Sequence, residues 1–361
     1  MMKFKYLYLL LILFPLMLAC TKGDKGGSSV PPPVMPGTEE EENKDDEKDD
    51  DDGPKPWDEN RGKSVRPEAG NGWTISTVAD GIIYYAFAGK ESVTNANQRI
   101  FVTEIDLNNT AYAVKMAYEG DRSTTSAVYK KTKAIACING GYERGSLWIR
   151  LNGTNYSTLP NDYITSGSYQ VPQWKSEAAV YLDGERDVRL EFTGRDMNLA
   201  EWRAAYRAKC STERTFITSA PMLIDDFEPV GEQFCTLHPV TYANCSEDPY
   251  VHQASTTNPR TLLAKTEDNH LLFMVVDGRR NISRGISAAE LTRFLVKNFN
   301  PQYAINLDGG GSSTMCVQGQ GDSETNVVNY PTDSDKVDAR PGAGDHTGER
   351  SVPTFFYVVK K

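Results

Sequence analysis

YAINLDGGGSST, residues 303–314, joins a short apolar run to one acid, three glycines and three hydroxyl side chains. An apolar run bounded by glycines predicts a buried strand, which here ends at Asp308. Consecutive glycines cost backbone entropy, so a packed domain keeps them where φ must be positive or where a ligand must approach the main chain closely. Backbone N–H groups left free by such a turn bind anions, most often phosphate. The stretch therefore predicts an anion site beside a carboxylate; the alternative is a tight turn that caps a helix.

A second strand end with the same pattern lies earlier in the chain. The apolar run 134–138 predicts a strand, and Asn139, Gly140 and Gly141 follow it. The pattern is again an apolar strand, one polar side chain and then glycines. We therefore expect the ends at Asn139 and Asp308 to meet at one site.

The region before the glycine stretch predicts a strand, a helix and another strand. The run 270–276 predicts a strand that ends at Asp277, and Ser287 with Glu290 forms a capping-box pattern that predicts the start of a helix. Together with the strand before Asp308, this order suggests a crossover unit. In parallel arrangements the carboxyl ends of such strands form the edge where ligands bind.

The rest of the folded sequence is rich in strand patterns. Asn108-Asn109 predicts a turn that makes a hairpin of its flanking strands, Asp183-Gly184 predicts another hairpin over residues 178–192, and Asn198 predicts the start of a helix. We expect an α+β fold: one sheet-rich domain over residues 71–361, with a few helices packed on mixed β-sheets. Further strands are predicted at 81–88, 99–107, 111–118, 261–265 and 352–359.

The N-terminus has the layout of an export signal. Lys3 and Lys5 precede an apolar run that ends at Ala19. A basic start, a short apolar core and a small last residue predict a secretory signal peptide over residues 1–19, too short and wrongly flanked for a spanning helix. The ending resembles a bacterial lipoprotein signal in which Cys20 is lipidated; the alternative is secretion without a lipid. We expect a cell-envelope protein outside the cytoplasm, facing the periplasm or the cell surface, whose membrane contact is the N-terminal lipid.

An acidic segment follows the signal. Residues 20–70 contain little that could form a core and are expected to be a disordered tether. Residues 39–52 hold eleven acids and two lysines, which account for nine of the chain's ten net negative charges. The folded remainder is therefore almost neutral, so the acidic balance reports the tether and not an acidic binding face. The alternative for this block is an export or display signal. No basic patch or RNA-binding pattern occurs, and nucleic acid is not an expected partner.

The cysteines suggest one disulfide and two buried thiols. Five cysteines follow Cys20, so at least one of them is unpaired within the chain. Cys235 and Cys245 flank a polar loop and are expected to form a disulfide. Cys137 and Cys316 lie in apolar strand contexts, which favours buried thiols over nucleophiles.

Polar residues at strand ends and glycine turns suggest the chemistry. Arginine recognises phosphate through planar paired donors, and glycine turns add N–H donors. Carboxylates supply the acid, base or nucleophile of glycoside chemistry. The combination suggests a substrate with both a phosphate and a sugar. The residues concerned are Asn139, Arg260, Asp277, Arg279, Asp308, Ser312, Ser313, Thr314, Glu349 and Arg350.

Seven motifs occur in the order expected of the phosphodiester glycosidase family, which the sequence resembles over about residues 81–359. The resemblance is specific from Asn258 onward and thin between Tyr142 and Asn258. The motifs are NGGY at 139–142, SAPMLI at 219–224, NPRT at 258–261, LLFMVVDGRR at 271–280, ISAAEL at 286–291, AINLDGGGSSTM at 304–315 and GERSV at 348–352.

The resemblance implies hydrolysis of the bond between a sugar's anomeric carbon and a phosphodiester, with release of a free sugar and a phosphomonoester. Two departures from the family pattern are expected to reshape the sugar side of the pocket: Glu143 and Arg144 after Tyr142, and the long polar segment 318–347. The pocket residues that the resemblance implies are Asn139, Gly140, Arg260, Asp277, Asp308, Gly309, Gly310, Gly311, Ser312, Ser313, Thr314, Glu349 and Arg350.

A phosphomonoester is already a good leaving group, so stabilisation of its charge is expected to dominate catalysis. Arg260, Arg350 and the amides of residues 309–312 are the predicted donors. One carboxylate, Asp308 or Glu349, would act at the anomeric carbon as base or nucleophile. Arg350 paired with Glu349, or Asp308 bonded to the turn amides, would be the purely structural alternatives.

Asp277 is a further catalytic candidate, and its structural alternative is a cap on its own glycine turn. The sequence requires no cofactor. Asp277 and Asp308 would suit an oxygen-loving divalent cation, although no ligand spacing demands one.

Two other functions stay open. A non-catalytic glycan-binding lipoprotein would use scattered aromatic side chains as a platform for sugars. A phosphodiesterase would break the phosphorus–oxygen bond instead of the glycosidic bond. The expected partner in the main hypothesis is a phosphodiester-linked glycan; its sugar, its aglycone and the oligomeric state do not follow from the sequence.

Overall fold

The computed structural model describes residues 59, 61–142, 146–159, 164–166, 169–171, 176–195, 197–232, 256–333 and 345–361. The predicted signal peptide, the lipidation site Cys20 and the predicted disulfide between Cys235 and Cys245 lie outside these residues. Most of the predicted tether lies outside them as well. No helix in the described part of the chain is long and apolar enough to cross a membrane.

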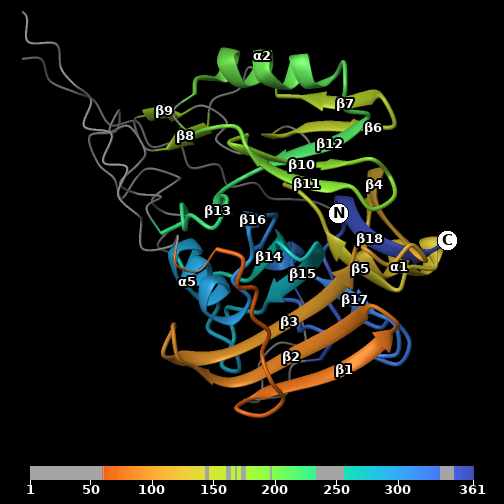
Figure 1. Cartoon of the computed structure of the whole chain (residues 1–361), viewed down its shortest axis with the longest axis vertical. Helices are drawn as coiled ribbons and strands as arrows, with labels where there is room; N and C mark the ends of the chain where they lie inside the picture. Colours follow the sequence, from red (N-terminus) through yellow and green to blue (C-terminus); the bar gives the residue numbers. More distant parts are fainter. Residues whose placement is uncertain are drawn as a thin grey trace, which may run out of the picture. The chain divides into compact units, whose positions relative to one another are not determined.

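A seven-stranded sheet forms the largest layer of the fold (Figure 1). At one end of this sheet, three neighbouring strands follow one another directly along the chain. In the rest of the sheet, most neighbouring strands are separated by longer stretches of sequence. In spatial order the strands are β1 (Trp73–Ala79), β2 (Ile82–Glu91), β3 (Ala96–Asp106), β15 (His270–Val276), β14 (Arg260–Lys265), β16 (Tyr303–Asn306) and β13 (Met222–Ile224).

Two smaller sheets and a two-stranded ribbon complete the β structure. The five-stranded sheet runs β11 (Val188–Phe192), β10 (Ala178–Leu182), β12 (Thr215–Ser219), β6 (Trp148–Leu151) and β7 (Thr154–Thr158). The four-stranded sheet runs β17 (Met315–Val317), β5 (Ala136–Asn139), β18 (Val352–Lys360) and β4 (Tyr112–Ser123). The ribbon pairs β8 (Ile164–Ser166) with β9 (Tyr169–Val171), and the helices are α1 (Thr125–Thr132), α2 (Leu199–Lys209) and α5 (Ala288–Asn298).

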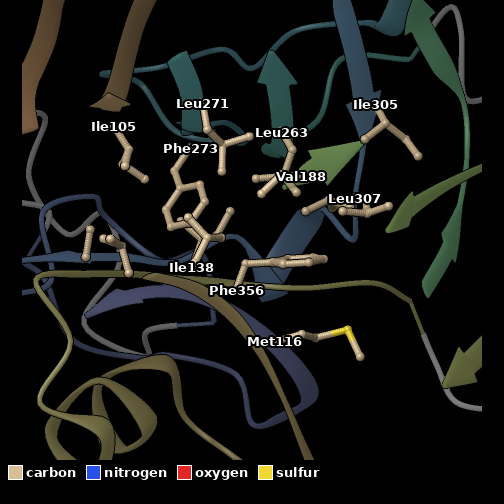
Figure 2. Packing of buried hydrophobic residues seen from close by; sticks show 14 of the residues in the cluster. Ile105, Met116, Ile138, Val188, Leu263, Leu271, Phe273, Ile305, Leu307 and Phe356 are labelled. Carbon is tan, nitrogen blue, oxygen red and sulfur yellow. The ribbon is translucent and has the colours of Figure 1, made fainter. Parts of the chain in front are cut away.

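Strand β15 explains the long apolar run in the sequence, because both of its faces are buried. Leu271, Phe273 and Val275 belong to one apolar cluster, and the alternate residues Leu272 and Met274 belong to another. The first cluster joins the three large sheets, and Figure 2 shows Phe273 near Ile138 and Phe356 of the four-stranded sheet. The second cluster packs against the apolar face of α5. The seven-stranded sheet is therefore a central layer.

Two of the three helices in the described residues, α5 and α2, begin where the sequence predicted. The Ser287 hydroxyl oxygen accepts a hydrogen bond from the Glu290 N–H, and the Glu290 carboxylate accepts one from the Ser287 N–H, so the predicted capping box is present. Asn198 and Glu201 form the same arrangement at the start of α2. The hairpin over residues 178–192 is also confirmed, with β10 paired antiparallel to β11.

The hairpin predicted at Asn108-Asn109 is wrong. Strand β3 already has β2 on one edge and β15 on the other, while β4 pairs with β18 in a different sheet. The two asparagines bond to neighbouring loops instead: Asn108 Nδ2 donates to Asp268 O over 3.2 Å, and Asn109 Nδ2 donates to Asp80 O over 3.1 Å. The local turn signal is real, but both edges of β3 are taken by other strands.

The α+β class with a few helices is confirmed, whereas the sheets are not mixed. Every strand pair among the described residues is antiparallel, and β15 and β16 point the same way because antiparallel β14 lies between them. The strand–helix–strand unit thus crosses over one intervening strand. The ends of β15 and β16 therefore lie at the same edge of the sheet.

The folded domain begins before Asn71, the start expected from composition. The Val65 N–H donates to Phe299 O over 3.1 Å, and Asn300 Nδ2 donates to Lys63 O over 3.0 Å. Arg66 Nε also donates to Glu104 over 2.6 Å. The end of the polar segment is therefore part of the domain surface.

Candidate active site

The glycine stretch connects two sheets. It leaves β16 of the seven-stranded sheet, passes through the 3-10 turn η4 (Gly310–Ser312) and enters β17 of the four-stranded sheet. The Asp308 N–H donates to Gly140 O over 3.1 Å, and Asn139 Nδ2 donates to Asp308 O over 2.7 Å. The two strand ends that the sequence paired, at Asn139 and Asp308, therefore do meet.

Close approach of other groups explains two of the three glycines. A Cβ on Gly309 would lie 2.5 Å from Pro259 O. A Cβ on Gly311 would lie 2.1 Å from Asp333 Oδ1 and 2.4 Å from Arg350 Nη2. Gly310 instead has a φ of +62°, which favours glycine. Larger residues would force the turn or its neighbours to move.

Most amides of the turn are already used within the protein. The Gly310 N–H donates to Pro259 O over 2.9 Å, and those of Ser312 and Ser313 donate to Gly309 O and Gly310 O over 3.2 and 3.3 Å. Within the described part of the chain, the amides of Gly309 and Gly311 have no such partner. The donor set expected at residues 309–312 is thus reduced to two.

A cavity of about 190 Å³ lies on this turn. Asp308 lines it together with three arginines, which come from β14, the loop after β15 and the segment before β18. The lining residues are Tyr142, Asn258, Pro259, Arg260, Arg279, Asp308, Gly309, Gly310, Gly311 and Arg350.

The buried arginine of the cavity is held by backbone carbonyls. Arg260 is 1% exposed, and its guanidinium donates to Ile286 O over 3.0 Å and to Thr256 O over 2.9 Å. Burial lowers the pKa of Arg260 to about 10, so the group stays protonated at neutral pH. Arg260 therefore supplies a fixed positive charge to the cavity wall.

The other two arginines flank the glycines. Arg279 has a φ of +59°, and its Nε and Nη2 donate to Asn258 Oδ1 over 3.1 and 2.7 Å. This places Nη2 3.3 Å from where a Cβ on Gly310 would lie. Arg350 lies beside Gly311, and its Nε and Nη2 donate to the two carboxylate oxygens of Asp333 over 2.7 and 3.1 Å.

The side chain of Asn139 connects the elements around the cavity without lining the cavity itself. It is fully buried and is not among the residues that line the cavity. Its Oδ1 lies 2.8 Å from Thr261 Oγ1 and accepts the Thr314 N–H over 3.1 Å, while its Nδ2 bonds Asp308. The side chain thus ties β5, β14 and the glycine turn to each other. Gly140 is needed beside it, because a Cβ there would lie 2.7 Å from Thr354 Oγ1.

The hydroxyl residues after the glycines point into the protein. Ser312, Ser313 and Thr314 are at most 1% exposed, and none lines the cavity. Ser313 Oγ lies 3.2 Å from Thr261 Oγ1. Among the described residues, the buried hydroxyls of Ser312 and Thr314 have no hydrogen-bond partner.

Asp277 is brought to the same sheet edge but not to the cavity. It is 1% exposed, and its carboxylate accepts hydrogen bonds from Asn329 Nδ2 over 3.1 Å and from the Tyr330 N–H over 3.0 Å. Burial raises the pKa of Asp277 to about 7, although these two bonds work in the opposite direction. The carboxylate faces the 329–330 segment that packs over it.

Glu349 is turned toward helix α1. Its Oε2 accepts the Ser126 N–H over 2.8 Å, in the first turn of that helix. An anion at a helix N-terminus is favoured by the unpaired amides there. Burial raises the pKa of Glu349, with the amides of Thr125 and Ser126 acting in the opposite direction. Glu349 is not among the residues that line the cavity.

The prediction for the two core cysteines is confirmed. Cys137 and Cys316 are buried free thiols opposite each other on β5 and β17. Burial raises the pKa of both thiols well above the usual range, so neither is a thiolate at neutral pH. Within the described ranges, no group of three or more His, Cys, Asp or Glu side chains could hold a metal ion.

Fold and site together define a sheet-rich α+β protein with a basic cavity on a glycine turn between two sheets. The model of the phosphodiester glycosidase family matches residues 132–359, and the chain belongs to this family of hydrolases. The resemblance noted from the motifs is therefore confirmed. No curated protein sequence matches the chain.

Three solved structures are similar to this chain. The catalytic domain of zebrafish N-acetylglucosamine-1-phosphodiester alpha-N-acetylglucosaminidase, auto-inhibited by its pro-peptide, matches with a TM-score of 0.51 and 15% identity, over 82% of this chain and 87% of that one. A hypothetical protein from Synechocystis matches at 0.46 and 12%, over 81% and 64%. A Burkholderia pseudomallei protein described as exported matches at 0.48 and 13%, over 83% and 99%. At these identities the likeness concerns the fold alone.

Tyr142 was quoted only as the last residue of the NGGY motif, and Asp333 carried no signal in the sequence. Tyr142 lines the cavity while its OH donates to Ala220 O over 2.9 Å. Asp333 reaches Arg350 from within the long polar segment, where nothing distinguishes it from the other acids nearby. The proximity of Arg350 to Gly311 could be predicted from the family motifs, but the partner of Arg350 could not.

Proposed function

We propose that this chain is a phosphodiester glycosidase that hydrolyses the bond between a sugar's anomeric carbon and a phosphodiester. The observation that carries the proposal is one cavity lined by Asp308 together with Arg260, Arg279 and Arg350. Carboxylates act at anomeric carbons, and arginine binds phosphate oxygens. A site with both can hold each half of a sugar-1-phosphodiester.

In the proposed step, water attacks the anomeric carbon while the bond to the phosphate oxygen breaks. Asp308 accepts a proton from the attacking water, and the bonding electrons leave with the phosphate oxygen. The products are a free sugar and a phosphomonoester. The arginines stabilise the negative charge that develops on the leaving oxygen, which replaces the need for a strong acid.

Asp308 is the preferred carboxylate because Glu349 is bonded to the amides at the start of α1. A direct attack by water inverts the configuration at the anomeric carbon, whereas a covalent step on Asp308 would retain it. The anomer released first, observed by proton NMR, therefore distinguishes a base from a nucleophile at this position.

The test of the function is hydrolysis of a panel of sugar-1-phosphodiesters in 18O-labelled water. Incorporation of the label into the sugar supports the proposal, because the oxygen of water then joins the anomeric carbon. Label in the phosphate means that the phosphorus–oxygen bond is broken and contradicts it. No turnover across a panel that varies sugar, anomer and aglycone also contradicts it and favours a glycan-binding protein.

We further propose that the enzyme works in the cell envelope, anchored by a lipid on Cys20. The support is the order of basic, apolar and small residues at the N-terminus. Metabolic labelling with a fatty acid should mark the wild-type protein and not Cys20→Ser. Equal labelling of both would contradict the anchor.

A further inference from the structure

The carboxylate of Asp333 does not line the cavity itself but pairs with Arg350, which does. Asp333 bonds the Nε and Nη2 edge of Arg350 with both oxygens, over 2.7 and 3.1 Å. The same carboxylate lies against Gly311, where an added Cβ would be 2.1 Å from its Oδ1. This two-oxygen arrangement on a guanidinium is the geometry that a phosphate group would adopt there.

Asp333 changes the charge that a ligand meets. Arg260, Arg279 and Arg350 line the cavity together with Asp308, so these four side chains carry a formal charge of plus two. The carboxylate of Asp333 reduces this to plus one. A phosphodiester carries one negative charge, while a phosphomonoester carries close to two at neutral pH. The charge of the cavity with Asp333 in place thus matches the diester better than the monoester.

We propose that Asp333 is a specificity-determining residue: paired with Arg350 over Gly311, its carboxylate disfavours doubly charged phosphate and so favours a phosphodiester substrate over the phosphomonoester product. The inference rests on the proposed function, because it concerns the phosphate side of the same cavity. It goes beyond that function because it assigns to Asp333 weaker binding, and therefore faster release, of the phosphomonoester product.

The ion pair has little to contribute to the fold. The side chains of Arg350 and Asp333 are 43% and 38% exposed, and ion pairs in contact with water stabilise proteins weakly. A charge near a ligand site acts on the ligand instead, because two like charges a few ångströms apart repel each other. A phosphomonoester carries a second negative charge, so the Asp333 carboxylate repels it more strongly than it repels a phosphodiester.

The experiment compares two small ligands of similar shape, methyl phosphate and dimethyl phosphate, by 31P NMR titration of the full chain at a fixed pH of about 8, where the monoester carries close to two charges. The variants are Asp333→Asn and, as a matched control, Glu324→Gln. Glu324 is an exposed acid in the same polar segment, and its loss changes the net charge equally. Circular dichroism checks that both variants fold.

We expect Asp333→Asn to bind methyl phosphate about three- to tenfold more tightly, with less than about a twofold change for dimethyl phosphate and no change in Glu324→Gln. Weaker binding of both ligands by Asp333→Asn would mean that Asp333 only positions Arg350, and would overturn the inference. An equal gain for both ligands, no change, or no binding of methyl phosphate would overturn it as well. Neither ligand has a glycosidic bond, so failure of the proposed hydrolysis would leave these results readable by themselves.

Discussion

Two carboxylates of this protein start from the same sequence pattern and end in opposite environments. Asp277 and Asp308 each follow a buried strand, each precedes glycine, and their strands β15 and β16 point in the same direction. Asp308 lines a cavity with three arginines, whereas Asp277 is buried under Asn329 and Tyr330. The strand-end pattern brings a carboxylate to the edge of the sheet where the cavity lies. The segment that packs over that edge decides whether a ligand can reach it.

The largest expected effect is the loss of the accessible carboxylate. Asp308→Asn removes the proposed base and should lower kcat/KM by about a thousandfold, because general bases contribute on this scale. The thermal midpoint should change little. Glu324→Gln is the matched control and should keep wild-type activity. Near wild-type turnover by Asp308→Asn would remove Asp308 from the mechanism.

A second test moves the glycine turn without changing its charge. In Gly309→Ala the new Cβ would meet Pro259 O at 2.5 Å, so the turn must shift. Displacements of this size in a catalytic site lower turnover by about a hundredfold. Gly120→Ala is the control, because its Cβ would find Tyr118 at an ordinary 3.9 Å. Equal activity of the two variants would show that the turn does not position the reacting groups.

Substitution of the buried carboxylate, Asp277, should lower the stability of the folded protein. Asp277→Ala leaves the donors of Asn329 and Tyr330 without their acceptor, which should cost about 1–3 kcal/mol in the free energy of unfolding, measured in urea. Asp277→Asn keeps one acceptor oxygen and should lose less. A large loss of turnover in fully folded Asp277→Asn would instead place this residue in the chemistry.

The last test is the dependence of stability on pH that the buried carboxylate of Asp277 should cause. Burial raises the pKa of Asp277 to about 7, so the folded protein keeps a proton that the unfolded chain releases near pH 4. The contribution of Asp277 to the free energy of unfolding should therefore fall as pH rises from about 4 to about 7. Asp277→Asn lacks this titration. The stability of the wild type relative to this variant should decrease across that range, and a flat or rising difference would contradict the assignment.

Local chemistry was predictable from the sequence where the determining residues are close in the chain. Ser287 with Glu290 fixes the start of α5 through their own hydrogen bonds, and the unbroken apolar run of β15 reflects the burial of both its faces. The meeting of Asn139 with Asp308 was predictable for a related reason. At both ends an apolar strand is followed by a polar side chain and glycines, and this pattern is typical of a tight turn at a sheet edge.

Longer-range pairing was not predictable in the same way. Asn108-Asn109 is a turn, but the strands on its two sides, β3 and β4, do not pair with each other. They pair with β15 and β18, which lie far along the chain. The burial of Asp277 depends on Tyr330, and the charge at Arg350 depends on Asp333. These partners come from a polar segment without periodicity, so no local rule selects them from their neighbours.

The antiparallel neighbours of β15 and β18 have a practical consequence for where the chain can be truncated. The family match begins at residue 132, yet β15 pairs with β3 from Ile100 to Asp106, and β18 pairs with β4. A fragment of residues 132–359 would carry two open strand edges with unpaired N–H and C=O groups. Such edges recruit other chains, so this fragment should aggregate when expressed alone. Strands β3 and β4 thus belong to the minimal folding unit, although the family match leaves them out.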